Sequence, residues 1–232
     1  MRVVRGRGTD PEDDRAVTAS LVVDAAETGE PALRVWAPHR QVAFGRRDAR
    51  EARFEAAKRA AGERGFVPLE RSVGGRAVAY TGETTLAFAH AVPITDERRG
   101  IDDRYESATE TVLRALRGMG VDAERGEPAD SFCPGDHSIR STTPPGGKLV
   151  GVAQRVRQGA ALVAGCVLVA DRAALQDVLE AVYGELGVDF DPESVGTVAD
   201  AGGPGDPGAV RTALEDAFVA TREKTVEYVD GG

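Results

Sequence analysis

Residues 146–169 read GGKLVGVAQRVRQGAALVAGCVLV. Two apolar runs, residues 149–156 and 160–169, flank the short connection Arg157-Gln158-Gly159. Their length and their content of valine favour β-strands. A connection of three residues that contains glycine is typical of a hairpin. We therefore expect these two strands to pair with each other.

Helices and strands follow one another irregularly on both sides of this hairpin. Asp10-Pro11 predicts a helix start, residues 48–64 and 105–116 have helical patterns, and Asp171 and Asp206-Pro207 predict two further helix starts. Strands do not alternate singly with helices, which argues against a doubly wound sheet. The predicted fold class is α+β, with a mixed, largely antiparallel sheet and packed helices. The other expected strands are residues 31–36, 41–44, 66–69, 77–80 and 84–92.

The chain has 232 residues, of which 41% are hydrophobic and 29% charged, as in a globular protein with a core. No internal repeat or linker divides it, so we expect one domain over residues 1–232, with residues 171–232 as its C-terminal helical part. No apolar run is long enough to span a membrane, and no secretory signal follows the N-terminus. We expect a cytoplasmic protein without a membrane partner.

The charge balance argues against nucleic acid as a partner. Acidic residues number 38 and basic residues 29, which gives a formal net charge of −9 without a long basic run. Lysine is scarce among the basic residues, being found at positions 58, 148 and 224. Lys148 lies among glycines at the start of a strand, where its ammonium could neutralise a phosphate or polarise an acyl carbonyl. The alternative is a solvated lysine at the rim of a hairpin.

A second segment has the chemistry of an anion-binding turn. Gly74 and Gly75 let the backbone approach a ligand, and Arg71 and Arg76 on either side suit a carboxylate or phosphate. The alternative is a tight turn between two strands with both arginines in water.

The two cysteines have different expected roles. Cys133 precedes Pro134-Gly135, which predicts an exposed turn, with His137 near enough to help form a thiolate. The alternative for Cys133 is a small buried residue, and that interpretation fits Cys166 better because it lies inside an apolar strand. The histidines are scattered and no zinc-ligand spacing is present, so we expect no metal site.

Together these segments resemble the lipoate–protein ligase and octanoyltransferase family, which shares its catalytic domain with biotin–protein ligases. Residues 31–36 and 42–46 look like the family's opening strands and Gly-Arg pair. Residues 71–78 are similar to its Arg-x-x-Gly-Gly-Arg/Gly-Ala-Val element, and residues 148–155 to its Lys-x-x-Gly-x-Ala-Gln-Arg element. The resemblance implies a class II biotin/lipoyl ligase-like catalytic domain.

The resemblance also implies an activity and a site. A lipoyl or octanoyl group would be attached through an amide to a lysine of a carrier, either a lipoyl domain of a 2-oxoacid dehydrogenase complex or the glycine cleavage H protein. Lys148 would contact the activated acyl carbonyl, and apolar strands would form a tunnel for the acyl chain. The substrate-binding positions would be Arg71, Gly74, Gly75, Arg76, Gly151 and Ala153.

Three mechanistic interpretations stay open at this point. The favoured one is a ligase that uses ATP with Mg to form an acyl-adenylate; no accessory domain is expected in this chain, so a separate accessory subunit is a candidate partner. The second is an octanoyltransferase without cofactor, in which Cys133 takes the acyl group from acyl carrier protein. The third is a non-catalytic acyl-binding partner subunit, suggested by Val73 and Tyr80, where the family usually has serine or threonine and histidine. Biotin ligase is disfavoured by the segment around Lys148.

Overall fold

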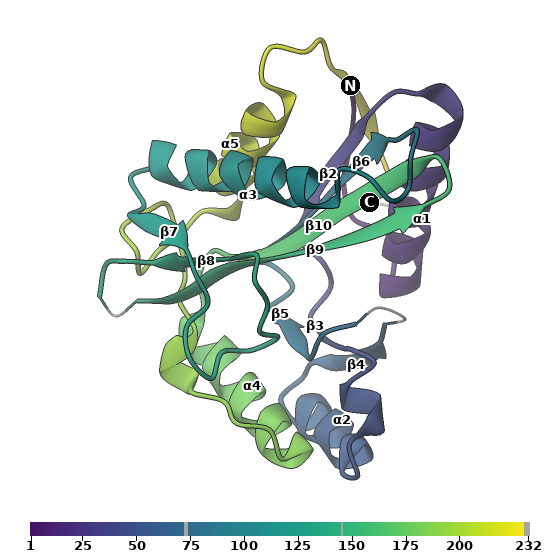
Figure 1. Ribbon diagram of the computed structural model, residues 1–232. Coiled ribbons are helices and arrows are strands. Elements are labelled where there is room, and N and C mark those ends of the chain that lie inside the picture. The colour runs from purple at the N-terminus through teal and green to yellow at the C-terminus, as the bar shows by residue number, and fades with distance from the viewer. Residues whose placement is uncertain (72–73, 145, 230–232) are drawn as a thin grey trace.

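The computed structural model describes residues 1–71, 74–144 and 146–229. Five α-helices and eleven strands are present in these residues (Figure 1). The helices are α1 (Pro11–Thr28), α2 (Phe54–Glu63), α3 (Ile101–Gly118), α4 (Arg172–Leu186) and α5 (Pro207–Val219). The strands are β1 (Arg2–Arg5), β2 (Ala32–Trp36), β3 (Gln41–Phe44), β4 (Val67–Glu70), β5 (Val78–Tyr80), β6 (Thr85–Pro93), β7 (Ala123–Arg125), β8 (Ser138–Ser141), β9 (Gly147–Arg157), β10 (Ala160–Leu168) and β11 (Thr225–Tyr228).

The predicted hairpin lies in the middle of the larger sheet. In the described chain this sheet has eight strands in the order β11-β1-β2-β6-β10-β9-β8-β7. β9 and β10 pair antiparallel from Ala160 opposite Arg157 onward, and β6 pairs antiparallel with both β10 and β2. β1 is parallel to both β2 and β11. The predicted α+β class with a mixed, largely antiparallel sheet is therefore confirmed.

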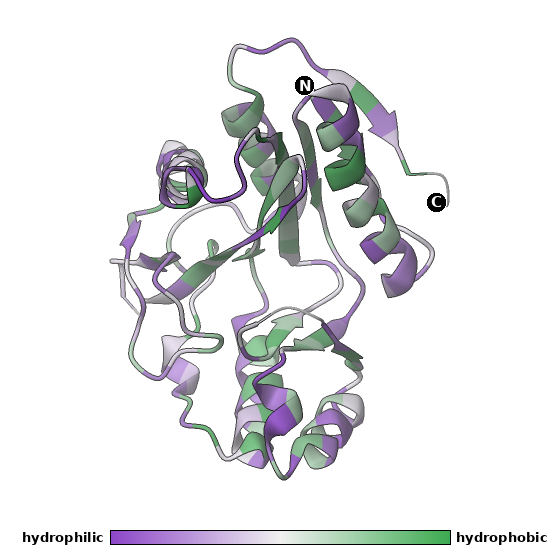
Figure 2. Ribbon diagram, turned by 45° about the vertical axis from the view of Figure 1, so that its right-hand side comes forward, coloured by the Kyte–Doolittle hydropathy of each residue, from purple (hydrophilic) through white to green (hydrophobic). Residues whose placement is uncertain are grey.

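Helices and a smaller sheet cover the two faces of the larger sheet. α3 and α5 pack over one face, where their apolar residues join those of β2, β6 and β10 in one core. The opposite face is covered at one end by α1. Its other end faces the three-stranded sheet β4-β3-β5, which α2 and α4 back (Figure 1). The small sheet and the centre of the large sheet are mainly hydrophobic (Figure 2). No helix within the described ranges is both long and apolar enough to cross a membrane.

Two of the predicted helix starts form as the sequence indicates. The carboxylate of Asp10 accepts the backbone N–H groups of Glu12 and Asp13 at the start of α1. Asp206 does the same for the first turn of α5. In both helices proline follows the capping aspartate, where its missing N–H costs no hydrogen bond.

Two other helix predictions were wrong in detail. Residues 48–64 do not form one helix, because the Asp48 carboxylate accepts the N–H of Gly45 and holds a short 3₁₀ turn at Asp48–Arg50, after which Glu51 is extended. α2 begins only at Phe54. Asp171 precedes α4 but does not cap it, because its backbone is left-handed and its carboxylate accepts the hydroxyl of Thr84.

The part predicted to be helical, residues 171–232, also contains a strand. β11 lies parallel to β1 at the edge of the large sheet, with Thr225 opposite Arg2 and Tyr228 opposite Arg5. Its side chains are mostly exposed, so they give no alternating pattern that sequence reasoning could detect.

Candidate active site

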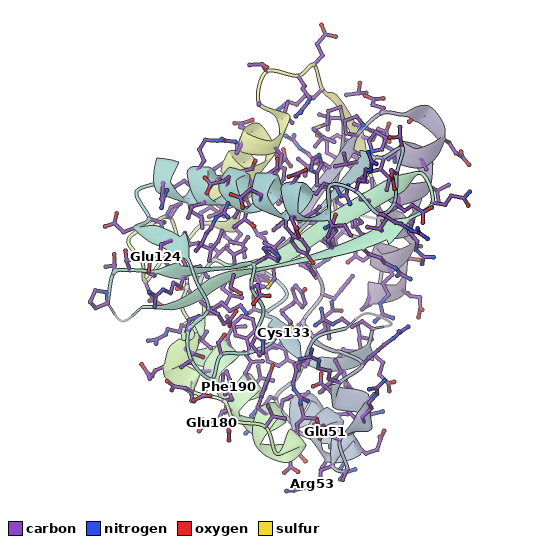
Figure 3. The ribbon with its side chains drawn as sticks, viewed as in Figure 1. Glu51, Arg53, Glu124, Cys133, Glu180 and Phe190 are labelled. Carbon is purple, nitrogen blue, oxygen red and sulfur yellow. The ribbon has the colours of Figure 1, made fainter. Side chains whose placement is uncertain are left out.

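Two of the predicted segments meet at the sulfur of Cys133. Its Sγ accepts a hydrogen bond from the backbone N–H of Arg76 at 3.4 Å and another from Nη2 of Arg71 at 3.5 Å. Cys133 lies between the large sheet and the layer formed by the small sheet and α4 (Figure 3). Charged and neutral N–H donors at this spacing can stabilise negative charge on sulfur. The turn before β5 therefore faces a thiol.

Gly75 is required by this close approach. A Cβ built on Gly75 would lie 2.9 Å from Sγ of Cys133, and the φ of Gly75 is +88°. Gly45 supports the same turn from the other side, since its Cβ would lie 2.1 Å from the carbonyl oxygen of Gly75. Gly74, the other predicted binding glycine, is exposed at the turn. Val73 lies outside the described residues.

The side chain of Arg76 is held by two carboxylates. Its Nη1 lies 3.3 Å from Oδ1 of Asp48 and 2.8 Å from Oε1 of Glu51. Burial raises the pKa of Asp48, against the opposing effects of its hydrogen bonds with Gly45 and Arg76. Arg71 in turn donates from Nη2 to the backbone oxygen of Arg76 at 2.6 Å. Neither arginine is a free, solvated side chain, so the simple-turn interpretation does not describe them.

Lys148 is buried beside the same turn. Its side chain is 1% exposed, which rules out the solvated hairpin rim. Nζ lies 3.1 Å from both carboxylate oxygens of Glu127 and 3.0 Å from the backbone oxygens of Phe132 and Cys133. It also lies 4.8 Å from the centre of the Phe132 ring. The ammonium therefore binds the backbone of the proposed nucleophile directly.

Glu127 is a site residue that sequence reasoning missed. Besides Lys148, its carboxylate accepts the N–H of Gly135 at 3.1 Å and the hydroxyl of Ser138. Glu127 lies before Cys133 in the chain and binds residues that follow it, so its carboxylate joins the two ends of the loop that carries Cys133. No motif marks Glu127, which precedes Lys148 by 21 residues and meets it only through the fold.

His137 does not take the role predicted for it. Its ring stacks on Tyr105 of α3, with ring centres 3.8 Å apart and planes 8° apart. Among the described residues, the hydrogen bonds of the Cys133 sulfur come from Arg71 and Arg76 and not from His137. The prediction that His137 helps form a thiolate is wrong, because an aromatic side chain from a distant helix holds the imidazole.

The remaining predicted positions lie on the hairpin. Gly151 is next to Lys148, and a Cβ built there would lie 3.9 Å from Nζ and from Sγ of Cys166. Ala153 is exposed two residues further along β9. Cys166 is 5% exposed within the core, and burial raises its pKa. Its environment suits an inert thiol.

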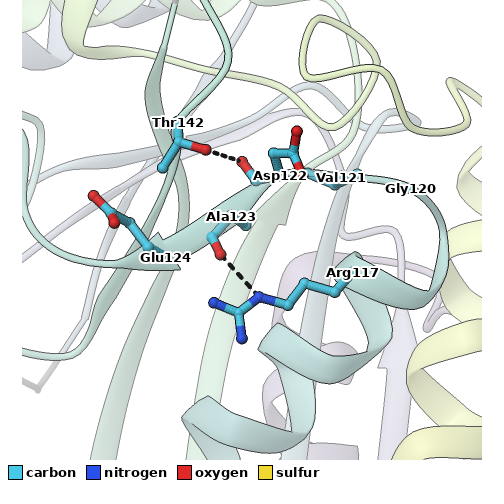
Figure 4. A pocket seen from close by; sticks show the side chains of 7 residues that line it. All are labelled: Arg117, Gly120, Val121, Asp122, Ala123, Glu124 and Thr142. Carbon is cyan, nitrogen blue, oxygen red and sulfur yellow. Dashed lines mark hydrogen bonds between the residues drawn. The ribbon is translucent and has the colours of Figure 1, made fainter.

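Two surface hollows lie away from Cys133. One of about 500 Å³ is formed by the end of α3, β7 and Thr142, where Arg117 donates to the backbone oxygen of Ala123 (Figure 4). The other, of about 440 Å³, lies between α1 and β11. None of the predicted site residues lines either hollow. The described ranges also contain no group of three or more His, Cys, Asp or Glu side chains placed to hold a metal ion.

The fold and the joined motifs define a known catalytic domain. The chain belongs to the lipoyl protein ligase A/B catalytic domain family, whose model matches residues 10–219. A solved structure of lipoate-protein ligase A with bound ATP superposes with a TM-score of 0.70 at 24% identity, covering 98% of this chain and 88% of the other. The expected ligase-like fold is therefore confirmed.

Two curated relatives are octanoyltransferases. The chain is 31% identical over 157 residues to the octanoyl-GcvH:protein N-octanoyltransferase of Bacillus velezensis, covering 66% of this chain and 53% of the relative. It is 29% identical over 218 residues to octanoyltransferase LipM of Kyrpidia tusciae, covering 85% of this chain and 78% of the relative. The chain thus spans about half the length of the first of these relatives.

Proposed function

We propose that this protein transfers an octanoyl or lipoyl group to a lysine of a lipoyl-domain protein, with Cys133 carrying the group as a thioester. The observation that supports it is the pair of donors, Arg71 and the Arg76 N–H, on the Cys133 sulfur. The names of the relatives also favour transfer, since one moves octanoyl from GcvH to a protein. This proposal places the cysteine route ahead of the ligase route that the sequence favoured.

The proposed reaction has two steps, acylation of Cys133 and transfer of the acyl group to the acceptor lysine. The Cys133 thiolate attacks the acyl carbonyl of the donor, a C–S bond forms, and the donor's thiol or lysine amine leaves with a proton. The neutral amine of the acceptor lysine then attacks the thioester, a C–N bond forms, and Cys133 leaves as a thiolate. The proton lost by the amine balances the one taken up by the first leaving group. Arg71 and the Arg76 N–H stabilise the sulfur whenever it is negative.

In this proposal Lys148 serves the nucleophile through its backbone. Its ammonium holds the Cys133 and Phe132 carbonyls, and the Glu127 carboxylate balances its charge. The loop is thereby fixed before substrate arrives, which lowers the reorganisation needed at the reacting sulfur. Contact between Lys148 and an acyl carbonyl, implied by the resemblance, would require the ammonium to exchange one of these acceptors.

The ligase alternative requires cations for the phosphates of ATP. Arg76 is paired with Asp48 and Glu51, and Lys148 with Glu127. In this arrangement Arg76 and Lys148 do not fit ATP with Mg, and the proposed reaction uses neither ATP nor Mg. An acyl-adenylate, a separate accessory subunit and a non-catalytic role stay predictions.

The test follows the mass of an acceptor, glycine cleavage H protein or an isolated lipoyl domain, mixed with the purified chain. The donors are octanoyl-acyl carrier protein, octanoylated H protein, and lipoate with ATP and Mg in separate mixtures. We expect acyl transfer from an octanoyl donor without ATP, with an acyl adduct on Cys133 in the mass spectrum. Cys133→Ser should abolish transfer, because an alkoxide is not available at neutral pH as a thiolate is.

Cys166→Ser is the matched control and should retain transfer, since Cys166 is buried in the core. Modification only with lipoate and ATP would establish the ligase instead. Tight acyl binding without transfer from any donor would support the non-catalytic partner. Full activity of Cys133→Ser would exclude the thioester mechanism.

A further inference from the structure

Cys133 has a backbone conformation that needs support. Its φ is 41°, in the left-handed region that residues other than glycine rarely adopt. Such a conformation persists only where surrounding contacts hold it. Lys148 holds the carbonyl of Cys133, and a different element holds its N–H group.

The second support is the hydroxyl of Tyr183 in α4. This side chain is completely buried, and its oxygen accepts the N–H of Cys133 at 2.6 Å. The same hydroxyl donates to the backbone oxygen of Ala77 at 3.0 Å. Because the hydroxyl donates its one proton to the backbone oxygen of Ala77, it accepts the N–H of Cys133 through a lone pair. Burial raises the pKa of Tyr183 well above its ordinary value, so the hydroxyl stays protonated in neutral solution.

The two partners of Tyr183 are the two sides of the sulfur site. Ala77 directly follows Arg76, whose N–H binds Sγ of Cys133. The hydroxyl therefore connects the backbone that carries the thiol to the backbone that supplies its hydrogen-bond donor. The Tyr183 ring packs against Phe190 at 5.0 Å between ring centres, which fixes the phenol from behind.

We propose that Tyr183 is a positioning residue that holds Cys133 in its left-handed conformation, so that Sγ stays against the Arg76 N–H and the Arg71 guanidinium. This inference rests on the proposed function, in which Cys133 is the nucleophile. It extends the site to α4, a helix that carries none of the residues singled out by the motifs. The hydroxyl acts through the backbone of Cys133 and needs no contact with substrate.

The test is Tyr183→Phe, which keeps the ring and removes the hydroxyl. We expect the rate of Cys133 alkylation by iodoacetamide at neutral pH to fall roughly five- to tenfold, with its pH profile moved to higher pH, because one hydrogen bond that orients the sulfur site is lost. The kcat for acyl-adduct formation should fall by a similar factor, while the KM for the donor is unchanged. Alkylation does not depend on turnover, so it reports on Tyr183 even if no donor is ever accepted.

Tyr105→Phe is the matched control. The Tyr105 hydroxyl also accepts a backbone N–H, that of the half-buried Gln154 at 2.8 Å, but it does not touch Cys133. We expect this variant to keep the wild-type alkylation profile. A folded Tyr183→Phe protein with the wild-type profile would overturn the proposal, and so would an equal change in both variants.

A second measurement covers the case in which Tyr183→Phe fails to fold. In the unmodified protein, the amide hydrogen of Cys133 should exchange with solvent far more slowly than in an unstructured peptide, because Tyr183 accepts it in a buried site. Exchange at the unstructured rate would show that this hydrogen bond is absent and would contradict the proposal. Protection at Cys133 together with absent acyl transfer from every donor would contradict the proposed function alone.

Discussion

At the scale of single residues, most polar side chains of the site are hydrogen-bonded to other protein groups and are not free to bind substrate. The ammonium of Lys148 contacts four oxygen atoms: both carboxylate oxygens of Glu127 and the backbone oxygens of Phe132 and Cys133. Charged groups this deeply buried are stable only when their hydrogen bonds are satisfied. Lysine is scarce in this chain, and at position 148 the compact ammonium makes contacts for which an arginine side chain is unsuited.

Lys148→Arg tests that view. The planar guanidinium is larger than an ammonium and directs its donors within one plane, so it cannot reach Glu127, Phe132 O and Cys133 O together. We expect acyl transfer to fall about a hundredfold, the effect of displacing reacting groups by about 1 Å. Lys58→Arg is the control, because Lys58 pairs with Glu55 and Glu70 at the surface. Normal turnover by Lys148→Arg would remove the role assigned to this lysine.

At the residue level, the sequence marks the segments around Arg71, Cys133 and Lys148, and the fold brings these three segments into contact. Their roles in the reaction stay predictions. Glu127 and Tyr183 could not be found, because neither belongs to a local pattern and each meets the site from a different part of the chain. His137 was misassigned for the same reason, since its partner is Tyr105.

At the scale of elements, local signals predicted most helices and strands. The hairpin of β9 and β10 and the starts of α1 and α5 depend on neighbouring residues, so their patterns could be detected directly. The break before α2 depends on the local contact of Asp48 with Gly45. The position of Asp171 and the strand β11 depend on contacts with distant segments. Such tertiary contacts override local propensity.

Close packing of β10 on β6 gives a prediction at this scale. A Cβ built on Gly165 would lie 2.5 Å from a ring carbon of Phe88 and 2.5 Å from the backbone oxygen of Gly151. Gly165→Ala should therefore lower the free energy of unfolding by roughly 1–3 kcal/mol through overpacking. Chemical denaturation followed by circular dichroism measures the change.

The control for this prediction is Gly184→Ala in α4. A Cβ built on Gly184 meets nothing within 4 Å, and alanine favours the helix over glycine. We expect this variant to raise the free energy of unfolding by roughly 0.5–1 kcal/mol. If Gly165→Ala were as well tolerated as Gly184→Ala, the proposed steric conflict in β10 would be wrong.

At the scale of the whole molecule, stability should depend on pH through His90 of β6. Burial, with a smaller effect of Arg222, lowers the pKa of His90 from 6.5 to about 4. The folded protein keeps this imidazole neutral, whereas the unfolded chain takes up a proton near pH 6.5. Protonation of His90 therefore favours unfolding as the pH falls from 6.5 toward 4.

We expect His90 to account for a loss of about 2 kcal/mol in the free energy of unfolding between pH 7 and pH 4.5. Urea denaturation of the wild type and of His90→Gln at the two pH values isolates this contribution from that of the carboxylates. The variant should lose about 2 kcal/mol less than the wild type over this interval. Equal losses would show that His90 titrates alike in both states.

The pairing of β1 with β11 also constrains the order in which the molecule can assemble during synthesis. Residues 2–5 are translated long before their outer neighbours in the sheet, residues 225–228. Until a ribosome has released those later residues, the parallel edge of the large sheet exposes unpaired N–H and C=O groups. Pairing of β1 with β11 therefore closes a loop of more than 200 residues, and the nascent chain must avoid association through the open edge until these strands pair.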